Sequence, residues 1–293
     1  MFQHPVPTED KLSSFYPESY YAYEPPNTDF IPRGLRHRLV WLKLHYLKYL
    51  RRYQHLPVWK NPILAFIGSL LDPRPFCFAA PEFSRGGCLL DYGSGTGSAV
   101  AFMQYIGWNA EGIEFNAMAA QAGKEAGLAV HHGSIETLEN LRDRYDYVMT
   151  SHCVEHVPDV WRLFRAFYTA LKPGGTLAVD VPNADAVAVD RYGKFYYFLG
   201  MPVHVHVFAH ASITYLAKAV GFRAVSVGTY SRWESQARSE MMKLRSKHKP
   251  SPQEGFFSLS KREVLWGRIR AIPTYLSSQK QGRGDCLVMV CKK

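Results

Sequence analysis

The sequence predicts an α/β protein in which a mostly parallel sheet carries helices on both of its faces. Between residues 88 and 230, short apolar runs alternate regularly with stretches of helical periodicity. Such alternation is typical of parallel strands joined by crossover helices. A glycine-rich turn, "GSGTG" (93–97), directly follows the first apolar run. Because such sheets bind ligands beyond the carboxyl ends of their strands, this turn marks the expected binding edge.

Each element is predicted from its local pattern. Short apolar runs, several of them rich in branched residues, predict strands at 88–92, 110–115, 128–132, 145–152, 176–182, 223–230 and 286–292. Apolar residues at three- and four-residue spacing predict helices at 98–106, 116–126, 159–171 and 211–220. The helix at 159–171 is stopped by "KPGG", since proline and glycine end a helical pattern.

Charge divides the chain into regions. The whole chain carries +10, yet residues 88–228 carry −3, so the two flanks together carry +13. We therefore expect a globular domain at 88–293, preceded by a basic and aromatic helical extension at 1–87. A basic insertion at about 232–281 precedes the last strand, and the tract 245–255 within it is expected to be a mobile loop.

The extension contains one long basic helix candidate, at 34–56. No acidic residue occurs between Asp29 and Asp72. We expect the apolar stripe of this helix to pack on the core. Attachment to an anionic membrane surface is the alternative, and nucleic-acid binding is a third, weaker one. The predicted stripe consists of Leu35, Leu39, Leu42, Tyr46, Tyr49 and Tyr53.

Composition points to the cytoplasm. The longest apolar run, 63–71, is about half the roughly 18 residues that a membrane span needs. The first ten residues lack the basic-then-apolar order of a signal peptide. Five cysteines are scattered without a CxxC pair, which favours neither a disulfide framework nor structural zinc and is typical of a reducing compartment.

The glycine turn favours a particular kind of ligand. Backbone without side chains can approach a ligand closely, and the helix that follows offers its N-terminus. A dinucleotide site has the pattern GxGxxG, whereas Ser98 stands here at the third glycine position. The pattern GxGxG behind Asp91 favours a ligand without pyrophosphate, such as an amino acid joined to a nucleoside. An ordinary strand-to-helix turn is the alternative for this loop taken alone.

A carboxylate follows at the expected distance for a ribose. Glu114 closes the second strand, 23 residues after Asp91. A carboxylate in this place can accept hydrogen bonds from both ribose hydroxyls. Because dinucleotide enzymes use the same device, this distance alone does not separate the two kinds of cofactor.

Four motifs together resemble the class I S-adenosylmethionine-dependent methyltransferases. They are "LLDYGSGTG" (89–97), "GIEFN" (112–116), "DYVMTSHCVEHVPD" (146–159) and "LKPGGTLAVDVPN" (171–183). The resemblance implies a Rossmann-like, seven-stranded, mostly parallel sheet whose last strand runs antiparallel. It also implies S-adenosyl-L-methionine as cofactor, bound by Asp91, Gly93, Gly95, Glu114 and Asn116, with the adenine near Ser134 and Ile135.

A closer resemblance includes the flanks. Residues 4–23 are similar to the segment that precedes the core in bacterial methyltransferases of sugar and cell-envelope polysaccharide biosynthesis. Their "PRHLxHF" corresponds to "PVHVHVF" (202–208), in which Val203 replaces arginine, and their "GRGDxLxVxxR" to "GRGDCLVMVCKK" (282–293). This resemblance implies methylation of an oxygen on a saccharide or envelope precursor. Methylation of a small lipid, quinone or natural product is the alternative, as is a non-catalytic binding module.

Histidines gather where an acceptor is expected. A sugar hydroxyl needs a general base, and histidine suits neutral pH. His156 follows the fourth strand and His204 follows the fifth, so both are candidate catalytic bases. The spacing of imidazoles and carboxylates in the sequence matches no ligand pattern, so no metal site is expected. Aromatic residues at 190–208 form either a packed lid or the wall of the acceptor site.

Overall fold

A computed structural model gives the fold of most of the chain. It describes residues 25, 26, 28, 35–71, 81–84, 86–200, 203–246 and 259–293, without the side chains of 35–40 and 69–71. The segment 4–23 and most of the basic tract 245–255 lie outside the described residues. The strands are β1 (Cys88–Tyr92), β2 (Asn109–Glu114), β3 (Val130–His132), β4 (Tyr145–Ser151), β5 (Leu171–Pro182), β6 (Arg223–Tyr230) and β7 (Cys286–Lys292). The α-helices are α2 (Leu35–Leu50), α3 (Pro62–Leu71), α4 (Ser98–Tyr105), α5 (Ala117–Glu125), α6 (Ile135–Glu139), α7 (Val160–Ala170), α8 (Val187–Tyr192), α9 (His210–Val220), α10 (Trp233–Arg245) and α11 (Lys261–Gln281).

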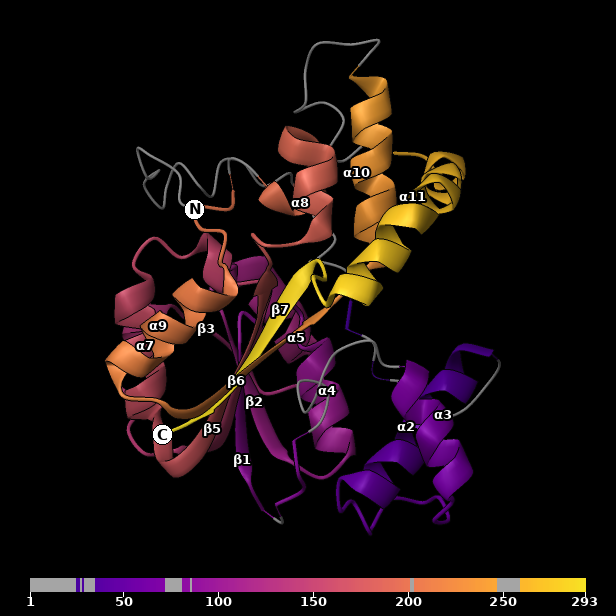
Figure 1. The fold of residues 1–293 in the computed structure, drawn as a ribbon. Coiled ribbons are helices and arrows are strands. Elements are labelled where there is room, and N and C mark those ends of the chain that lie inside the picture. Colours follow the sequence, from indigo (N-terminus) through magenta and orange to yellow (C-terminus); the bar gives the residue numbers. More distant parts are fainter. Residues whose placement is uncertain are drawn as a thin grey trace.

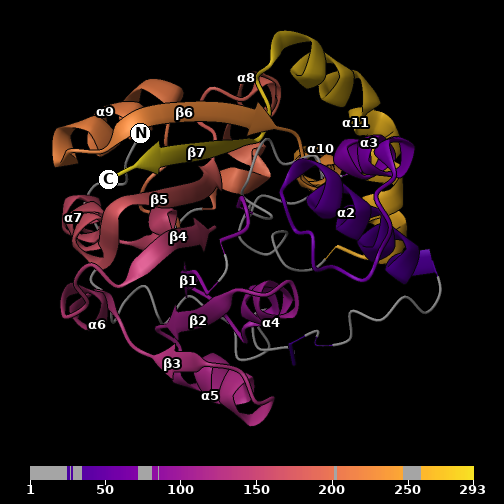
Figure 2. The ribbon, with the colours of Figure 1, turned by 90° about the horizontal axis from the view of Figure 1, so that it is seen from below.

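The seven strands form one sheet in the order β3-β2-β1-β4-β5-β7-β6. Strand β7 runs antiparallel to both of its neighbours, β5 and β6, while the pairs from β3 through β5 are parallel. Helices α6, α7 and α9 lie on one face and α4 on the other (Figure 2). The predicted fold class is confirmed, including the antiparallel last strand.

Most element boundaries agree closely with the predictions. Strand β5 is the clearest difference, because pairing begins at Leu171 rather than at Thr176. The motif "KPGG" lies between the paired residues Leu171 and Thr176, where the register shifts, and its Gly174 has a φ of 77°. Strand β3 is also shorter than predicted, since it begins at Val130.

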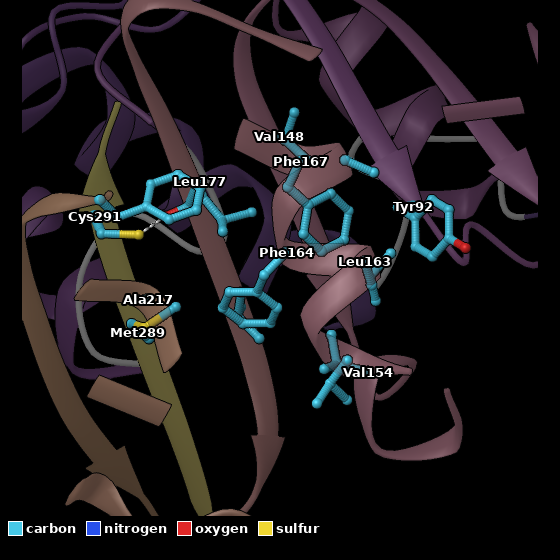
Figure 3. Packing of buried hydrophobic residues seen from close by; sticks show 14 of the residues in the cluster. Tyr92, Val148, Val154, Leu163, Phe164, Phe167, Leu177, Ala217, Met289 and Cys291 are labelled. Atoms are coloured by element: carbon cyan, nitrogen blue, oxygen red, sulfur yellow. Dashed lines mark hydrogen bonds between the residues drawn. The ribbon is translucent and has the colours of Figure 1, made fainter. Parts of the chain in front are cut away.

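Helix α7 shows how the core positions the binding edge. It is capped by Asp159, whose Oδ1 accepts a hydrogen bond from the N–H of Arg162 at 2.9 Å. Its buried face packs Leu163, Phe164 and Phe167 against strands β4 and β5 (Figure 3). Because β5 is covered on both faces, its residues from Thr176 to Pro182 are all buried. The loops that follow β4 and β5 thus start from a rigid base.

The predicted basic insertion contains two helices that the sequence reading did not identify. Helices α10 and α11 pack on each other, and both contact α8. Figure 1 shows α8, α10 and α11 rising together above the carboxyl ends of the parallel strands. This helical layer places Arg232, the residue just before α10, next to the predicted binding edge.

The N-terminal extension differs from the predicted single helix. Helix α2 ends at Leu50 and Arg52 has a φ of 64°, so the chain turns there and α3 packs back on α2. The predicted apolar stripe is also wrong in part, because Tyr49 is exposed. Among the described side chains of α2, the buried ones are Leu44, His45 and Leu47, while those of Leu35 and Leu39 lie outside the described part.

This helical pair contacts the sheet domain through α2 and the segment that follows it. Trp108 Nε1 donates to the hydroxyl of the buried Tyr53 at 2.8 Å, and Lys43 lies over the ring of Phe102 at 4.8 Å. Within the described part of the chain, none of the helices combines the length and the apolar character needed to cross a bilayer.

Candidate functional site

The turn between β1 and α4 presents bare backbone at the binding edge. Gly93, Gly95 and Gly97 have φ angles of 77°, 55° and 90°, a region that side chains disfavour. A Cβ atom at Gly93 would lie 2.6 Å from the sulfur of Cys153. The N–H of Gly93 donates to the carbonyl of Ile113 at 2.8 Å, which ties the turn to β2. Glycine is therefore required here by both conformation and space.

The carboxylate of Glu114 joins this turn to the start of α5. Its Oε2 accepts the N–H of Gly95 and its Oε1 accepts the N–H of Asn116, both at 2.8 Å. Asn116 in turn caps α5, because its Oδ1 accepts the N–H of Ala119 at 3.0 Å. Burial raises the pKa of Glu114, while these backbone N–H groups lower it. Each carboxylate oxygen has a second lone pair with which to accept a hydroxyl.

A second buried carboxyl group lies close by, at the end of β1. Asp91 is 4% exposed. Burial first, and then the charge of Glu114, raise the pKa of Asp91 to about 7. Two carboxyl groups in one buried site repel each other when both are ionised. A cationic ligand group beside them would relieve this repulsion.

The predicted adenine contacts follow the neighbouring strand β3. Ser134 is exposed and precedes α6, while Ile135, the first residue of α6, is buried. The N–H of Gly133 donates to the carbonyl of Glu114 at 2.9 Å, which holds this loop beside the end of β2. The predicted cofactor residues therefore lie at the carboxyl ends of three adjacent strands. A bare turn, a cradled carboxylate and an apolar side chain fit an aminoacyl nucleoside.

The loop after β4 carries a chain of charged and polar groups that runs from the buried Glu155 through His152 to the exposed Arg232. Glu155 is fully buried in the short 3₁₀ helix Val154–His156, and its Oε1 lies 3.3 Å from Nδ1 of His152. Arg232 donates to Nε2 of His152 at 3.1 Å. An arginine is only a donor, so His152 accepts at Nε2 and donates from Nδ1 to Glu155. The backbone of His152 has a φ of 51°, a conformation found in few non-glycine residues.

The loops after β4 and β5 are held together by backbone and side-chain hydrogen bonds. The N–H groups of Val205 and His206 both donate to the carbonyl of Glu155, at 2.9 and 3.1 Å. Nδ1 of His156 lies 3.0 Å from the carbonyl oxygen of Val203. The fold thus joins segments that the sequence separates.

These contacts bring the two candidate bases together. The rings of His156 and His204 meet edge to face, with their centroids 4.6 Å apart. Nδ1 of His204 lies 3.0 Å from the carbonyl oxygen of Phe198. Burial first, and then the neighbouring His156, lower the pKa of His204 to about 4, so its imidazole is neutral at physiological pH. His206 instead contacts the carbonyl of Pro158 through Nε2 at 3.1 Å.

The sequence interpretation missed Glu155 and Arg232. Glu155 directly precedes His156, so its place in the motif "EH" was a signal that could have identified it. Burial alone would raise the pKa of Glu155. The hydrogen bond from His152 and the nearby His156 outweigh burial and hold this pKa at about 2. Arg232 comes from a distant loop, and only the fold brings it to His152.

The described aromatic residues between positions 190 and 208 form a packed layer over this edge. Tyr192, Tyr196 and Phe198 are buried. The ring of Phe198 stacks on His152 with centroids 5.2 Å apart and an interplanar angle of 17°. The packed lid is therefore observed in part, and its role as an acceptor wall stays a prediction.

Comparison with known proteins places this architecture among methyltransferases. Residues 68–227 match the family model of a methyltransferase domain. The chain is 31% identical over 123 residues to phosphoethanolamine N-methyltransferase 2 of Caenorhabditis elegans, covering 39% of this chain and 26% of that protein. It is 31% identical over 107 residues to the ubiquinone biosynthesis O-methyltransferase of Pseudomonas syringae pv. syringae, covering 34% and 46%. The matches thus span between a quarter and a half of these relatives.

Solved structures share the fold. A SAM-dependent methyltransferase from Archaeoglobus fulgidus superposes with a TM-score of 0.50 at 19% identity, covering 71% of this chain and 86% of that one. Phosphoethanolamine N-methyltransferase 2 of Haemonchus contortus gives a TM-score of 0.50 at 17% identity, covering 91% and 60%. At these identities the likeness concerns the fold.

Proposed function

This chain belongs to the methyltransferase-domain family with S-adenosylmethionine as its methyl donor, and from that premise we propose a cofactor site and an acceptor class. The cofactor lies against the turn at 93–97 with its ribose on Glu114. The acceptor is the oxygen of a saccharide or cell-envelope precursor. The proposed cofactor contacts are Asp91, Gly93, Gly95, Glu114, Asn116, Ser134 and Ile135.

The observation that carries the cofactor site is the cradled carboxylate of Glu114. Two backbone N–H groups hold this side chain at the carboxyl end of β2, beside glycines that offer no side chain. Such an anchored acceptor loses little conformational entropy when a ribose binds. Asp91 can then pair with the cofactor's ammonium group, which relieves its repulsion with Glu114.

The bound cofactor supplies a methyl group that its sulfonium already activates. The residues of this chain then align the acceptor oxygen and remove its proton. His156 and His204 lie at the carboxyl ends of β4 and β5, toward which the cofactor's methyl group would point. We favour His156 as the base, because the lowered pKa of His204 makes that imidazole a weak proton acceptor.

The acceptor class rests on segments outside the shared core. Residues 202–208 and 282–293 resemble the corresponding motifs of polysaccharide-linked methyltransferases. The second of these segments contains Asp285, which is buried and accepts hydrogen bonds from Gln236 and the N–H of Arg232. This contact fixes the start of α10 and with it Arg232 beside His152. A sugar ring would stack on the aromatic residues of 190–208.

The curated relatives favour a second acceptor class. One is named for phosphoethanolamine and the others for ubiquinone biosynthesis. A labelled-methyl assay separates the classes when it offers cell-envelope saccharide fractions, phosphoethanolamine and a phenolic quinone precursor in parallel. Label in the saccharide fraction supports our proposal. Label only in one of the other two assigns the second class, and cofactor binding without any transfer favours a non-catalytic module.

We also propose that the pair α2 and α3 contacts an anionic membrane surface, which would suit a lipid-linked acceptor. The exposed side chains of this region include Trp59, Ile63 and Phe66, which are 62%, 69% and 62% exposed. Arg52 and Lys60 are exposed nearby, and residues 35–71 contain no acidic side chain. Apolar side chains with adjacent basic residues are typical of interfacial membrane binding.

A further inference from the structure

Three side chains at the junction of the β4 and β5 loops form a set of metal-binding donors. Glu155, His156 and His204 each offer one ligand atom, and these atoms lie within 4.8 Å of one another. We propose that these residues bind one divalent transition-metal ion. The sequence places His204 far from the "EH" pair, so spacing alone indicated no metal site, whereas the fold brings the three together.

The carboxylate of Glu155 points to a cation. The residue is fully buried, and no group among the described residues donates a hydrogen bond to its Oε2. A buried carboxylate oxygen without a partner is costly, and a metal ion in the same place would satisfy it. Its other oxygen, Oε1, is oriented by His152.

The two imidazoles are oriented as metal ligands usually are. Nδ1 of His156 lies against the carbonyl oxygen of Val203, and Nδ1 of His204 lies against that of Phe198, each at 3.0 Å. A carbonyl only accepts, so each Nδ1 carries a hydrogen and Nε2 bears the lone pair. Backbone carbonyls fix the tautomer of ligating histidines in this manner.

The position of His204 depends on a glycine. Gly200 has a φ of 56°, and a Cβ atom built there would overlap the ring of His204. The N–H of His204 donates to the carbonyl of Gly200 at 3.1 Å. A tight turn without a side chain therefore seats this imidazole against the loop, so the donor set is held in place before any ion binds.

The donor set indicates which ions would bind. Two imidazoles and one carboxylate suit Zn²⁺, Fe²⁺ or Co²⁺ better than Mg²⁺ or Ca²⁺, which prefer oxygen ligands. Three protein ligands leave further coordination positions for water or a substrate oxygen.

The catalytic consequence rests on the proposed function, whereas ion binding does not. With the ion bound, His156 would be a ligand and no longer a free base, so the general-base role proposed for His156 applies to the metal-free protein. A metal-bound acceptor hydroxyl would lose its proton to solvent water. The oxygen lone pair then forms the new O–CH3 bond while the S–CH3 bond breaks. The electron pair of the broken S–CH3 bond returns to sulfur, and the product of the cofactor is S-adenosylhomocysteine.

A second cluster of donors lies nearby but is less suited to an ion. Ligand atoms of His152, Asp180 and Cys286 also lie within 4.8 Å of one another. However, Nε2 of His152 accepts from Arg232, and the hydroxyl of Tyr230 donates to Asp180 at 2.8 Å. Burial, first among the causes, raises the pKa of the Cys286 thiol well above its usual value, so the thiolate form is disfavoured. We therefore assign the ion to the first cluster.

The test is Co²⁺ binding to the chelator-treated full chain, measured by equilibrium dialysis and visible absorption without cofactor or acceptor. We expect about one equivalent, with Glu155→Gln and His204→Gln each weakening binding by about 100-fold. His206→Gln is the matched control, because this histidine lies on the same loop and contacts Pro158 instead. Circular dichroism and S-adenosylhomocysteine affinity establish that each variant is folded. If Glu155→Gln does not fold, the result for His204→Gln decides the test.

Two results would overturn the assignment. One is less than half an equivalent of Co²⁺, or binding by both variants equal to that of the parent. The other is a sulfur-to-cobalt absorption band that disappears in Cys286→Ser, which would place the ion in the second cluster. Because no methyl transfer is measured, a failure of the acceptor proposal leaves this result unaffected.

Discussion

The N–H of Gly95 donates a 2.8 Å hydrogen bond to Oε2 of Glu114, which links the glycine turn to the end of β2. If this link holds the ribose site, Glu114→Ala should weaken S-adenosylhomocysteine binding by about 1–3 kcal/mol through lost charged hydrogen bonds. Gly95→Val should abolish binding, because its φ of 55° disfavours a branched side chain. Calorimetry measures both.

The matched control is Glu125→Ala, which removes an exposed glutamate on α5 that contacts Gln121. Its affinity should equal that of the parent. Binding of NAD in place of S-adenosylhomocysteine would contradict the cofactor site.

Cofactor affinity should depend on pH through Asp91. Its pKa of about 7 means that the carboxyl group is largely protonated at pH 6 in the free protein. Pairing with the cofactor's ammonium group requires the ionised form, so binding below pH 7 should release a proton. Affinity should then rise by up to about tenfold per pH unit toward pH 7 and level off above it.

Calorimetry in two buffers of different ionisation enthalpy counts the released proton. Asp91→Asn should bind more weakly at pH 8 and show no proton release. A variant that still released the proton would assign the titration to another group, with Glu114 the first to examine.

Sequence patterns predicted the sheet well because its strands are locally encoded. Strands β1, β6 and β7 begin and end where the sequence interpretation placed them. The predicted helix at 34–56 was too long, because the backbone reversal at Arg52 has no glycine or proline to mark it. Helices α10 and α11 were missed because α10 buries polar side chains such as Gln236, while α11 exposes large apolar ones such as Trp266, so neither shows a clear amphipathic pattern.

The candidate site was predictable only in part. Asp91 and Glu114 lie at strand ends, whose position follows from the alternating pattern alone. The contact between His156 and His204 depends instead on hydrogen bonds from Val205 and His206 to Glu155, which join loops distant in the sequence. No local pattern encodes such a contact, so the donor set emerged only from the fold.

Substituting His156 should reduce turnover without weakening the cofactor. His156→Asn should keep S-adenosylhomocysteine affinity and lose about 100- to 10,000-fold in kcat, the usual scale for loss of a general base. His131→Asn is the control, since this exposed histidine on β3 contacts Glu111. Equal loss of affinity, turnover and thermal stability in His156→Asn would indicate a structural role.

The pH profile separates the two histidines. Because the pKa of His204 is about 4, proton removal by His204 would place the acid limb of kcat near pH 4. A limb at about pH 6–7, the range usual for histidine, would have to come from another group. We expect kcat of the parent to fall on the acid side within this higher pH range. The residual activity of His204→Asn should fall within the same range. A parent limb near pH 4 would contradict our preference for His156.

Two glycines with similar backbone angles provide a test of local packing. Gly282 and Gly200 both lie in the left-handed region, with φ angles of 63° and 56° and ψ angles of 24° and 15°, but a Cβ at Gly282 meets nothing within 4 Å. Gly282→Ala should therefore cost only the left-handed backbone penalty, roughly 1–2 kcal/mol. Gly200→Ala should cost more and also weaken Co²⁺ binding, because the ring of His204 must move. Denaturant unfolding measures the difference, and equal losses would refute the packing argument.

Membrane attachment through α2 and α3 should require both charge and apolar contact. Arg51 is a poor site for charge reversal, because its Nε donates to the hydroxyl of Tyr46 at 3.1 Å. Arg52→Glu combined with Lys60→Glu should reduce co-sedimentation with anionic liposomes by at least about tenfold. The reason is that each basic residue near an anionic surface contributes about 1 kcal/mol of attraction. Ile63→Ser combined with Phe66→Ser should also reduce it, but with little change in salt dependence.

The charge-matched control for that surface lies on the opposite side of the sheet. Lys218→Glu with Arg223→Glu reverses two exposed basic residues at the end of α9 and the start of β6. This variant should sediment like the parent, because attachment through α2 and α3 does not involve α9. High salt should weaken the parent's binding, since screening shortens the reach of surface charge. Equal binding to neutral liposomes, or equal loss in the control, would refute attachment through this surface.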